Sequence, residues 1–538
     1  MVAGSLQSSP RSFANDQLIK RSTDGSSSIF DSDDGKFIVF SNDNAKEVTQ
    51  IRLDDVYAVF RNGLELKLES CPRVVSRKKW FFGVKHVKPK NPFERVCQAH
   101  TFSLGNDLEA DEWCIYIKKE VAPCYSTPLV EGSPLRNLLV LVNPIGGKRK
   151  GEEMYHELLK PMLDGAGTGH EVIVTTGPGH AEEVAKTFDI YRFGAVAIVG
   201  GDGLFGEFLN GLNKRDDRLQ ALLIPLGVVP AGSSNCIACS VGLRQPLAAC
   251  FAIARGKAKP MDVLKVTLTG EDLANPNPHV MLSMCGVSYG FISEVNTHAG
   301  KWRRLFGPAR YTVCGFRTLV SSPMKYHVDC RFIAPSHDCD PEFDKTECGP
   351  DCLTCEHAGH SARRLGVVHD PSSPSPPDPS YVSNGLCTNA PDQVWTDSVV
   401  SMGPRRRSVK PECKNLDNSS LLLLSVTNLA IRQSQNWTVW NANSHMSSGY
   451  MDLVMMPVLS RTQLLKFFSN YNKGGGKHKE DPNVFSIIKA QSVEMRITNA
   501  DSFPEWEREI KIAIDGETYP LQPLRVDNLH GFLNFICC

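Results

Sequence analysis

The stretch GAVAIVGGDGLFGE, from Gly194 to Glu207, decides the fold of this chain. Its first seven residues are an unbroken apolar run, which is typical of a strand buried on both faces of a parallel sheet. Glycines on both sides of Asp202 allow a sharp turn that presents the carboxylate where the strand ends. Ligands of open α/β sheets bind at this end of the strands, so we expect Asp202 to lie in a ligand site.

Three more runs of this kind surround that stretch. They are NLLVLV (Asn137 to Val142), HEVIVTT (His170 to Thr176) and ALLIPLGVVP (Ala221 to Pro230), and polar helical stretches separate them. Strands that alternate with helices predict a doubly wound α/β domain with a parallel sheet. We place this domain at residues 133–262.

The loops after two of these strands also carry small residues. Residues 143–148 read NPIGGK and residues 230–235 read PAGSSN. Glycine lets backbone N–H groups approach a phosphate closely, and Lys148 adds positive charge. The spacing differs from GxxxxGK followed by Ser or Thr, so the first loop is not a P-loop. Together with the GGDG turn, these loops predict a phosphate-binding site at one edge of the sheet.

An ionised Asp202 at that edge has two uses in phosphoryl transfer. It could accept a proton from a hydroxyl group, or it could help to hold Mg²⁺. The alternative is structural, because an aspartate after a strand can also cap the N-terminus of a helix. The turn alone leaves these interpretations open.

The part of the chain before the α/β domain has a different pattern. Residues 1–28 are rich in Ser, Asp and Asn and are expected to be disordered. Residues 29–125 contain short β-rich runs and end in a helical segment. Several strands followed by one helix with a Trp resemble a pleckstrin homology domain, which implies a small β-barrel. The apolar face of the helix is expected to hold Leu108, Trp113, Ile115, Ile117 and Val121.

This N-terminal part also contains a strongly basic segment. Residues 73–90 include seven Lys or Arg and no Asp or Glu. Near a membrane, such a segment attracts anionic phospholipid headgroups by about 1 kcal/mol per charge. A solvated loop is the alternative interpretation.

Residues 263–538 return to β-rich runs and predict a second, mainly antiparallel domain. Residues 335–419 interrupt it with a segment rich in Pro, Ser and Cys, which we expect to be largely disordered. Within it, Cys348, Cys352 and Cys355 form the pattern CxxxCxxC, which suits zinc or redox chemistry as well as plain reduced thiols.

The segment QLLKFFSNY, Gln463 to Tyr471, combines apolar residues with a lysine. This pattern fits a calmodulin-type target helix, and it also fits a core helix of the second domain. The sequence favours the core helix.

The composition of the whole chain limits its partners and its location. Lys plus Arg equal Asp plus Glu at 59 each in 538 residues, so no overall field attracts nucleic acid, which is not an expected partner. The 18 cysteines are scattered and the N-terminus lacks an apolar signal core, which predicts reduced thiols in the cytoplasm. The apolar runs are too short to span a bilayer, so we expect peripheral binding to internal membranes or the plasma membrane.

Five motifs together carry a family resemblance. LLVLVNPIGGK, TTGPGHA, VGGDGLFGEFLNGL, IPLGVVPAGSSN and PMDV resemble the diacylglycerol kinase catalytic superfamily, from about Leu135 to the C-terminus. The resemblance implies a two-domain lipid kinase with ATP in the cleft, Mg²⁺ as cofactor, Ca²⁺ as a regulator and Asp202 as general base.

Within that superfamily, three features resemble the ceramide kinase family. They are the pleckstrin-like N-terminus, the Leu-Phe pair and Glu207 after GGDG, and the CxxxCxxC cluster. This resemblance implies ceramide in a membrane as the acceptor. A sphingosine or diacylglycerol kinase and a non-catalytic lipid-binding adaptor are the alternatives.

The resemblance also implies which residues form the site. Nucleotide contacts fall on Asn143, Pro144, Ile145, Gly146, Gly147, Lys148, Thr175, Thr176, Gly177, Pro178, Gly179, Glu207, Gly232, Ser233, Ser234, Arg304, Arg310, Asp515, Gly516 and Glu517. Substrate contacts fall on Gly200, Gly201, Asp202, Gly203, Glu294 and Asn296. Asp202 and Asp515 are expected to hold Mg²⁺.

Two departures from the related motifs bear on these assignments. The loop reads GSSN where GSGN is commoner, and Ser234 is less free than glycine to adopt a positive φ. Sphingosine kinases have two aspartates where this chain has Glu294 and Asn296. One acid fewer suits the neutral amide of ceramide better than the charged amine of sphingosine.

Overall fold

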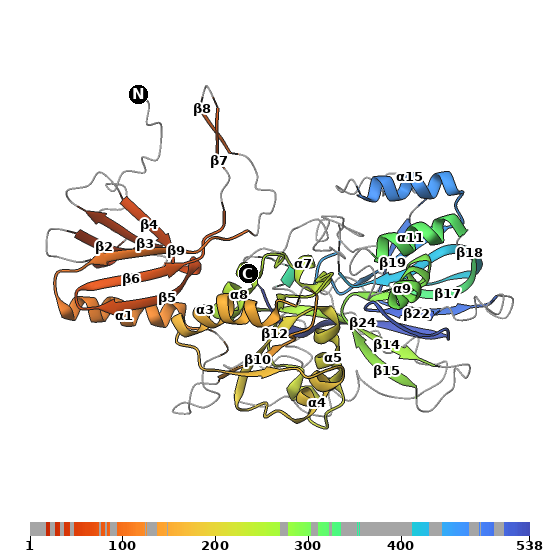
Figure 1. Cartoon of the computed structure of the whole chain (residues 1–538), viewed down its shortest axis with the longest axis horizontal. Helices are drawn as coiled ribbons and strands as arrows, with labels where there is room; N and C mark the ends of the chain where they lie inside the picture. Colours follow the sequence, from red (N-terminus) through yellow and green to blue (C-terminus); the bar gives the residue numbers. More distant parts are fainter. Residues whose placement is uncertain are drawn as a thin grey trace.

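The computed structural model describes the chain in segments, which fall into three parts (Figure 1). A β-rich N-terminal part lies at one end, a central α/β domain follows, and a β-rich C-terminal domain lies at the other end. The described residues are 18–21, 27–32, 37–42, 48–74, 77–80, 83–86, 94–123, 125, 137–147, 149–269, 278–302, 310–321, 325–334, 352, 354–355, 412–429, 444–472, 484, 486–499 and 511–537.

In the described residues, three antiparallel sheets, a short 3₁₀ helix (Leu53–Asp55) and one α-helix form the N-terminal part. The sheets have the orders β1-β2-β3-β4, β5-β6-β9 and β7-β8. The strands are β1 (Leu18–Arg21), β2 (Ser27–Ser32), β3 (Phe37–Asn42), β4 (Val48–Arg52), β5 (Val56–Asn62), β6 (Glu65–Ser70), β7 (Arg77–Trp80), β8 (Gly83–His86) and β9 (Gln98–Ser103). The first strand begins at Leu18, so β structure starts before the boundary predicted at residue 28.

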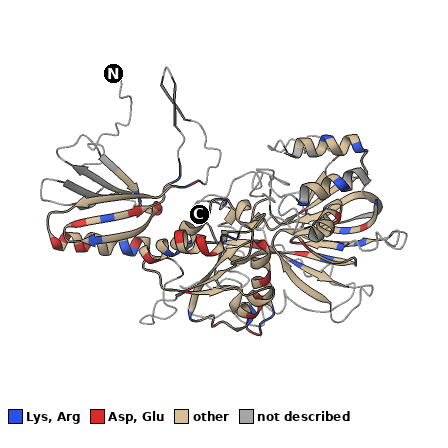
Figure 2. Cartoon of the chain, viewed as in Figure 1, with Lys and Arg blue, Asp and Glu red and all other residues tan. Residues whose placement is uncertain are grey.

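Helix α1 (Asp107–Val121) covers the core of this part. Trp113, Ile117 and Val121 are buried, as predicted, whereas Leu108 and Ile115 are 71% and 68% exposed. The prediction for these two was wrong because they lie on the opposite side of a helix with 3.6 residues per turn. Acidic residues in the first turn and lysines in the last turn suit the helix dipole (Figure 2).

The N-terminal part packs directly on the central domain. Tyr57 of β5 meets Phe251 edge to face, with ring centroids 6.3 Å apart. The backbone N–H of Arg95 donates to Gln245 Oε1 at 2.8 Å, and the Arg95 guanidinium lies 4.2 Å from the centre of the Phe251 ring.

A parallel sheet in the order β11-β10-β12-β13 forms the centre of the α/β domain, as predicted. The strands are β10 (Asn137–Val142), β11 (His170–Val174), β12 (Phe193–Gly200) and β13 (Leu226–Pro230). Figure 1 shows α3 (Lys160–Gly165) and α8 (Pro246–Arg255) on one face, with α4 (His180–Thr187) and α5 (Asp202–Asn213) on the other. The strand predicted from Ala221 begins only at Leu226, because α6 (Arg218–Ala221) and Pro225 precede it.

The C-terminal domain is mainly antiparallel, as predicted. Its strands are β14 (Ala258–Leu268), β15 (His279–Ser283), β16 (Gly286–Gly290), β17 (Tyr326–Ala334), β18 (Glu412–Thr427), β19 (Met451–Pro457), β20 (Ser486–Ala490), β21 (Ser492–Ile497), β22 (Lys511–Ile514), β23 (Glu517–Pro520) and β24 (Leu524–Ile536). Its long helices are α9 (Phe291–Lys301), α11 (Arg310–Ser321) and α15 (Arg461–Asn472).

Strand β24 joins the two domains into one sheet. Its residue Phe535 pairs in parallel with Leu226 of β13 and antiparallel with Lys259 of β14. The Phe535 ring also lies 5.9 Å from the ring of Phe205 on α5, in the core of the central domain. The domain boundary predicted between residues 262 and 263 therefore falls inside β14, and one continuous sheet runs through both domains.

Helix α15 contains the segment considered as a calmodulin target. Its Leu464 and Phe467 are buried in a cluster with Phe291, Leu422 and Val454. Burial of these two side chains supports the core-helix interpretation, and nothing in the described part of the chain supports calmodulin binding. Among the described residues, no helix is long and apolar enough to cross a membrane.

Candidate active site

The three predicted loops meet through their backbones. A Cβ atom on Gly147, which has a φ of +53°, would lie 2.4 Å from the carbonyl oxygen of Ala231. A Cβ on Gly232 would lie 2.4 Å from the Cα of Gly201. Contacts this short exclude any side chain at these positions. The loops after β10, β12 and β13 therefore form one continuous surface, and Asp202 follows Gly201 directly.

Asp202 begins helix α5 and is half-buried. Its Oδ2 accepts a hydrogen bond from the backbone N–H of Cys236 at 2.8 Å, and its Oδ1 accepts one from Ile237 at 2.9 Å. Both donors belong to the first turn of α7 (Cys236–Ser240). Asp202 was considered as a helix cap, and it does cap a helix. The capped helix is α7, however, and not α5, which begins at Asp202.

The surroundings of Asp202 raise the pKa of its carboxyl group. Burial is the largest cause, because it disfavours the charged form. The two hydrogen bonds from α7 act in the opposite direction, and the negative charge of Asp515 adds to the increase. The influence of Asp515 brings a residue of the C-terminal domain into the electrostatics of this site.

Asp515 lies in the turn between β22 and β23 with a φ of +50°. Its Oδ1 accepts from the Ser283 hydroxyl at 2.7 Å and from the N–H groups of Cys285 at 2.8 Å and Gly286 at 3.0 Å. Its Oδ2 accepts from the N–H of Met284 at 2.8 Å. Each carboxylate oxygen has about two acceptor positions, so Oδ1 is fully used by the protein and Oδ2 keeps about one position.

The occupancy of these positions bears on the predicted Mg²⁺ site. Oxygen donors suit Mg²⁺, and Asp202 keeps about two acceptor positions beyond its two hydrogen bonds. Oδ2 of Asp515 likewise keeps about one acceptor position beyond its bond from the N–H of Met284. Both carboxylates therefore fit as oxygen ligands of a metal ion, and Asp515 also holds the turn of residues 283–286 through its hydrogen bonds. The carboxylate of Glu517, two residues further on, is exposed.

A pair of thiols links the two domains next to these acids. Cys236 lies at the start of α7, and Cys285 lies in the turn held by Asp515. The Cys236 side chain and burial raise the pKa of Cys285, and the charges of Asp515 and Asp202 act in the same direction. Neither cysteine belongs to a recognisable motif, so their proximity was not predictable from the sequence.

Glu207 binds the first turn of α4, next to the loop of residues 175–179. Its Oε1 accepts from the N–H groups of Ala181 at 2.8 Å and Glu182 at 3.4 Å, in the first turn of α4. Thr176 N–H donates to His180 Nδ1 at 3.1 Å. Glu207 thus holds the start of α4, and with it the TTGPG loop, against α5.

In the GSSN loop, the residue with a positive φ lies one position later than expected. Asn235, not Ser234, adopts the positive φ, at +52°. Its Oδ1 accepts from the N–H of Gly232 at 2.7 Å, and its Nδ2 donates to the Gly232 carbonyl at 3.0 Å. Serine at position 234 is therefore compatible with this loop.

The remaining predicted residues lie elsewhere in the chain. Glu294 and Asn296 lie on α9, where the Tyr326 hydroxyl donates to Glu294 Oε1 at 3.2 Å and Glu294 is buried. Arg310 begins α11. Lys148, Arg304 and Cys348 lie outside the described residues.

Residues 137–266 match the family model of the diacylglycerol kinase catalytic domain. This match covers strands β10 to β13, the three loops and most of β14. Over these residues the central domain is similar to the catalytic domain of diacylglycerol kinases.

Comparison with individual proteins gives kinases of sphingolipids. The chain is 30% identical over 328 residues to sphingoid long-chain bases kinase 1 of Arabidopsis thaliana, covering 59% of this chain and 41% of that protein. It is 29% identical over 236 residues to ceramide kinase of Homo sapiens, covering 41% of this chain and 42% of that protein. Each alignment thus spans less than half the length of the relative.

A similar solved structure is that of a diacylglycerol kinase from Bacillus anthracis. It has a TM-score of 0.44 and 14% sequence identity, and it covers 75% of this chain and 97% of that one.

The close contact between loops predicts a difference between two glycines. Gly232→Ala places a methyl group against the Gly201 backbone and should lower the free energy of unfolding by about 1–3 kcal/mol. Gly203→Ala is the control, because nothing lies within 4 Å of its added Cβ and alanine favours the helix. Thermal unfolding measures both variants. Equal midpoints for Gly232→Ala and the wild type would contradict the loop contact.

The hydrogen bonds of Asp515 predict a difference between two neighbouring acids. Asp515→Asn turns an amide donor toward one of the N–H groups of residues 284–286 and should cost about 1–3 kcal/mol of stability. Glu517→Gln changes an exposed side chain and should stay within about 0.5 kcal/mol of the wild type. Chemical denaturation of both variants tests this. Similar losses for the two would show that Asp515 does not position the turn.

Proposed function

We propose that this chain is an ATP-dependent lipid kinase that transfers the γ-phosphoryl group of ATP to the primary hydroxyl of ceramide, giving ceramide 1-phosphate. The observation that carries the proposal is the position of Asp202, beside the contact of the three glycine loops in a matched catalytic domain. ATP supplies the transferred group. The similarity to human ceramide kinase and to a sphingoid base kinase supports a sphingolipid as acceptor.

In this proposal Asp202 is the general base. The two N–H groups of α7 orient its carboxylate and favour its ionised form. Its remaining lone pairs are free to accept the hydroxyl proton as the acceptor oxygen attacks the phosphorus. A raised pKa makes the group a stronger base than an ordinary aspartate.

The glycine loops would hold the phosphates of ATP. The backbone N–H groups of Gly146, Gly147 and Ser234 lie in the loops at the carboxyl ends of parallel strands, where anions bind. Glu207 would keep the loop of residues 175–179 in place through the start of α4. Mg²⁺, when bound near Asp202, would neutralise charge on the phosphates.

The environment of α9 favours a neutral acceptor. Glu294 is 5% exposed and accepts from the Tyr326 hydroxyl, so its carboxylate is engaged inside the C-terminal domain. Asn296 carries no charge. An ammonium group buried here without a free acid would be costly, whereas an amide needs only hydrogen bonds.

A second candidate acceptor is a sphingoid base. The relative from Arabidopsis thaliana is named for that substrate and matches 59% of this chain. Diacylglycerol is a third acceptor, because the family model takes its name from it.

We further propose that the enzyme works at a membrane surface. The N-terminal part would act as a pleckstrin-like module, and its hairpin β7-β8 carries four of the basic residues, Arg77, Lys78, Lys79 and Lys85. This hairpin would meet anionic phospholipids.

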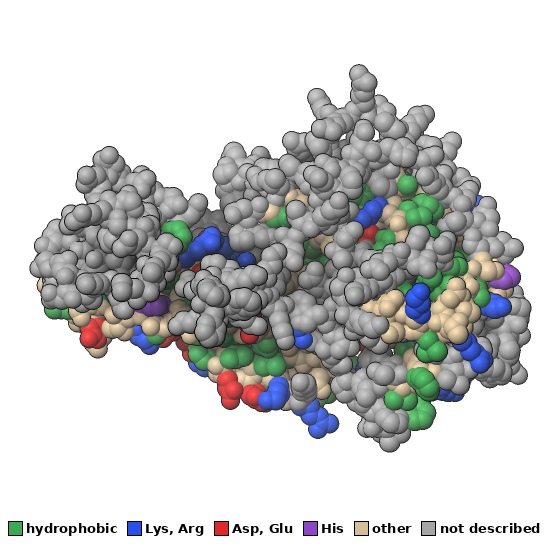
Figure 3. All heavy atoms as spheres, turned by 90° about the horizontal axis from the view of Figure 1, so that it is seen from above, with side chains coloured by type: hydrophobic (Ala, Val, Ile, Leu, Met, Phe, Trp, Pro, Cys, Tyr) green, Lys and Arg blue, Asp and Glu red, His purple; other side chains and the backbone are tan. Residues whose placement is uncertain are grey.

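Two helices of the C-terminal domain support the same proposal. On α11 and α15, Phe316 and Leu465 are 64% and 54% exposed beside the exposed Arg317 and Lys466. Both helices lie on the upper side in Figure 1, and Figure 3 shows apolar and basic side chains together on that side of the C-terminal domain. Exposed apolar and basic groups suit an anionic lipid surface.

The role of Asp202 predicts both a loss of activity and a pH profile. Asp202→Asn should lower turnover by about 10²–10⁴-fold, because the amide cannot accept the hydroxyl proton. Equilibrium ATP binding and the unfolding midpoint serve as controls for an intact site. Full retained turnover would contradict the assigned base.

The pH profile of the wild type follows from the direction of the pKa shift. The base must be ionised, so kcat/KM falls as pH drops through its pKa. Since the pKa of Asp202 is raised above the usual 3.8, the acid limb should lie at a higher pH than that of an ordinary aspartate. The limb should be absent from the residual activity of Asp202→Asn.

The acceptor is tested with purified full-length chain and labelled ATP. Ceramide, sphingosine and diacylglycerol are supplied in separate mixed micelles, with Asp202→Asn as the background. We expect ceramide to exceed sphingosine by more than about tenfold in kcat/KM, a difference of about 1.4 kcal/mol. Preference for sphingosine would favour a sphingoid base as the acceptor. If no lipid were phosphorylated, the result would favour a non-catalytic lipid-binding adaptor.

A further inference from the structure

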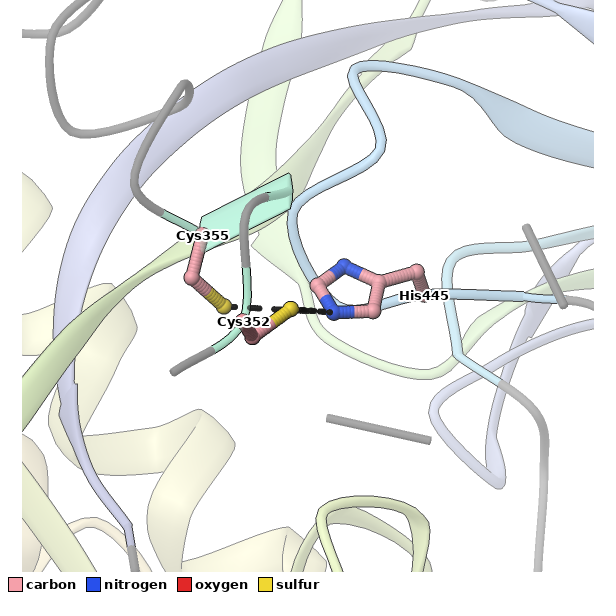
Figure 4. A group of neighbouring side chains, drawn as sticks. All are labelled: Cys352, Cys355 and His445. Atoms are coloured by element: carbon pink, nitrogen blue, oxygen red, sulfur yellow. Dashed lines mark hydrogen bonds between the residues drawn. The ribbon is translucent and has the colours of Figure 1, made fainter. Parts of the chain in front are cut away.

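Three potential metal ligands meet outside the candidate active site. Cys352 and Cys355 come from the segment between β17 and β18, and His445 comes from the segment before β19. Figure 4 shows both sulfur atoms directed toward the imidazole ring. Sγ of Cys352 lies 3.2 Å from His445 Nε2, and Sγ of Cys355 lies 3.9 Å from it. All three ligand atoms lie within 4.8 Å of one another.

These separations suit tetrahedral zinc. Zinc binds sulfur at about 2.3 Å and nitrogen at about 2.0 Å, so a tetrahedral angle places a sulfur ligand about 3.5 Å from a nitrogen ligand. The two observed distances of 3.2 and 3.9 Å lie on either side of that value. Small shifts of the side chains would make both equal.

We propose that Cys352, Cys355 and His445 bind a Zn²⁺ ion. Two thiolates and one imidazole are the ligand types of structural zinc sites, and two cysteines with two residues between them are a common ligand pair. The described residues supply three of the four ligands that such a site needs. The burial of Cys355 and His445 would protect the ion from exchange with solvent.

The ligand His445 is fixed to the junction of the two domains. The N–H of Asp262 donates to the Met446 carbonyl at 2.7 Å, and the N–H of Gly449 donates to Asp262 Oδ2 at 2.7 Å. Asp262 is fully buried, and its Oδ1 also accepts from Gly531 of β24 at 2.7 Å. The PMDV motif thus fixes the segment that carries His445, although the sequence alone did not link these residues.

The two cysteines come from the long segment between β17 and β18. Cys355 belongs to the apolar core of the central domain, and Cys352 packs against that core. A zinc ion shared with His445 would fasten this segment to the domain junction. The zinc ion would connect Cys355 with His445, which are 90 positions apart in the sequence. Such a link stabilises the folded chain because it lowers the conformational entropy of the unfolded chain.

Zinc binding would change the hydrogen bonds of the His445 ring and the position of its proton. In the metal-free ring, Nδ1 accepts from the N–H of Ser447 at 3.1 Å, so Nε2 carries the proton toward Cys352. Zinc at Nε2 moves the ring proton to Nδ1, and the Ser447 N–H must turn away. Both thiols lose their protons on binding, so affinity should fall as the pH is lowered.

The first experiment measures zinc in the purified full-length chain by mass spectrometry after desalting. We expect about one ion per chain in the wild type. His445→Asn should lose the ion, because the amide can still accept from Ser447 but cannot reach the metal. Cys355→Ser should also lose it. Cys97→Ser, which removes an exposed thiol outside the cluster, should retain it.

A rescue variant separates loss of a ligand from loss of folding. His445→Cys supplies another zinc ligand at the same position and should recover bound metal. Tetrahedral Co²⁺ with sulfur ligands should give strong d–d absorption in the wild type and in His445→Cys, but not in His445→Asn. A strong zinc chelator should lower the unfolding midpoint of the wild type and leave that of His445→Asn unchanged.

Several results would overturn the proposal. One is a wild-type chain that is free of zinc and binds added Zn²⁺ no more tightly than His445→Asn. Another is a Cys352–Cys355 disulfide in peptides from protein purified without oxidant, which would assign the pair to redox chemistry. A third is full zinc content in His445→Asn, which would remove His445 from the site. These readouts do not depend on kinase activity, so they stand apart from the proposed function.

Discussion

The contact between glycine backbones is the constraint on which the candidate active site depends. Gly147 meets Ala231, and Gly201 meets Gly232, at distances that leave no room for a Cβ. Because the backbones touch, the three loops can present their N–H groups to one common ligand. The same contacts fix Asp202 within reach of the amides of α7. The position and the hydrogen bonding of the acid thus depend on the absence of side chains at three glycines, Gly147, Gly201 and Gly232.

Local patterns were sufficient to predict the central domain. Apolar runs at β10, β11 and β12 gave the strands, and the loops that follow the strands gave the location of the site. Long-range pairing was not predictable in this way. Strand β24 joins both domains through Phe535, yet nothing in its sequence specifies β13 as a neighbour. On α1 the apolar residues were all assigned to the core, although helical geometry places Leu108 outside it.

The sequence identified the acids of the site more easily than their roles. Asp202 and Asp515 both follow strands and both precede glycine, so a motif treats them alike. The structure separates them by the number of hydrogen bonds that each accepts, which is two for one carboxylate and four for the other. His445 was missed for a related reason, since it lies about 90 residues from Cys355 and has no neighbouring ligand in the sequence. Roles that depend on distant contacts are visible only after folding.

The path of β24 also affects how the protein is made. On the ribosome, β10 to β13 emerge first and can pair with one another, but β13 keeps an unpaired edge until residues 524–536 are synthesised. An exposed strand edge is prone to pair with other chains. During translation the central domain would therefore remain open along β13, and folding would be completed only after the whole C-terminal domain has left the exit tunnel. A premature stop upstream of β24 would thus be expected to damage the nucleotide-binding half of the molecule as well as the half in which it falls.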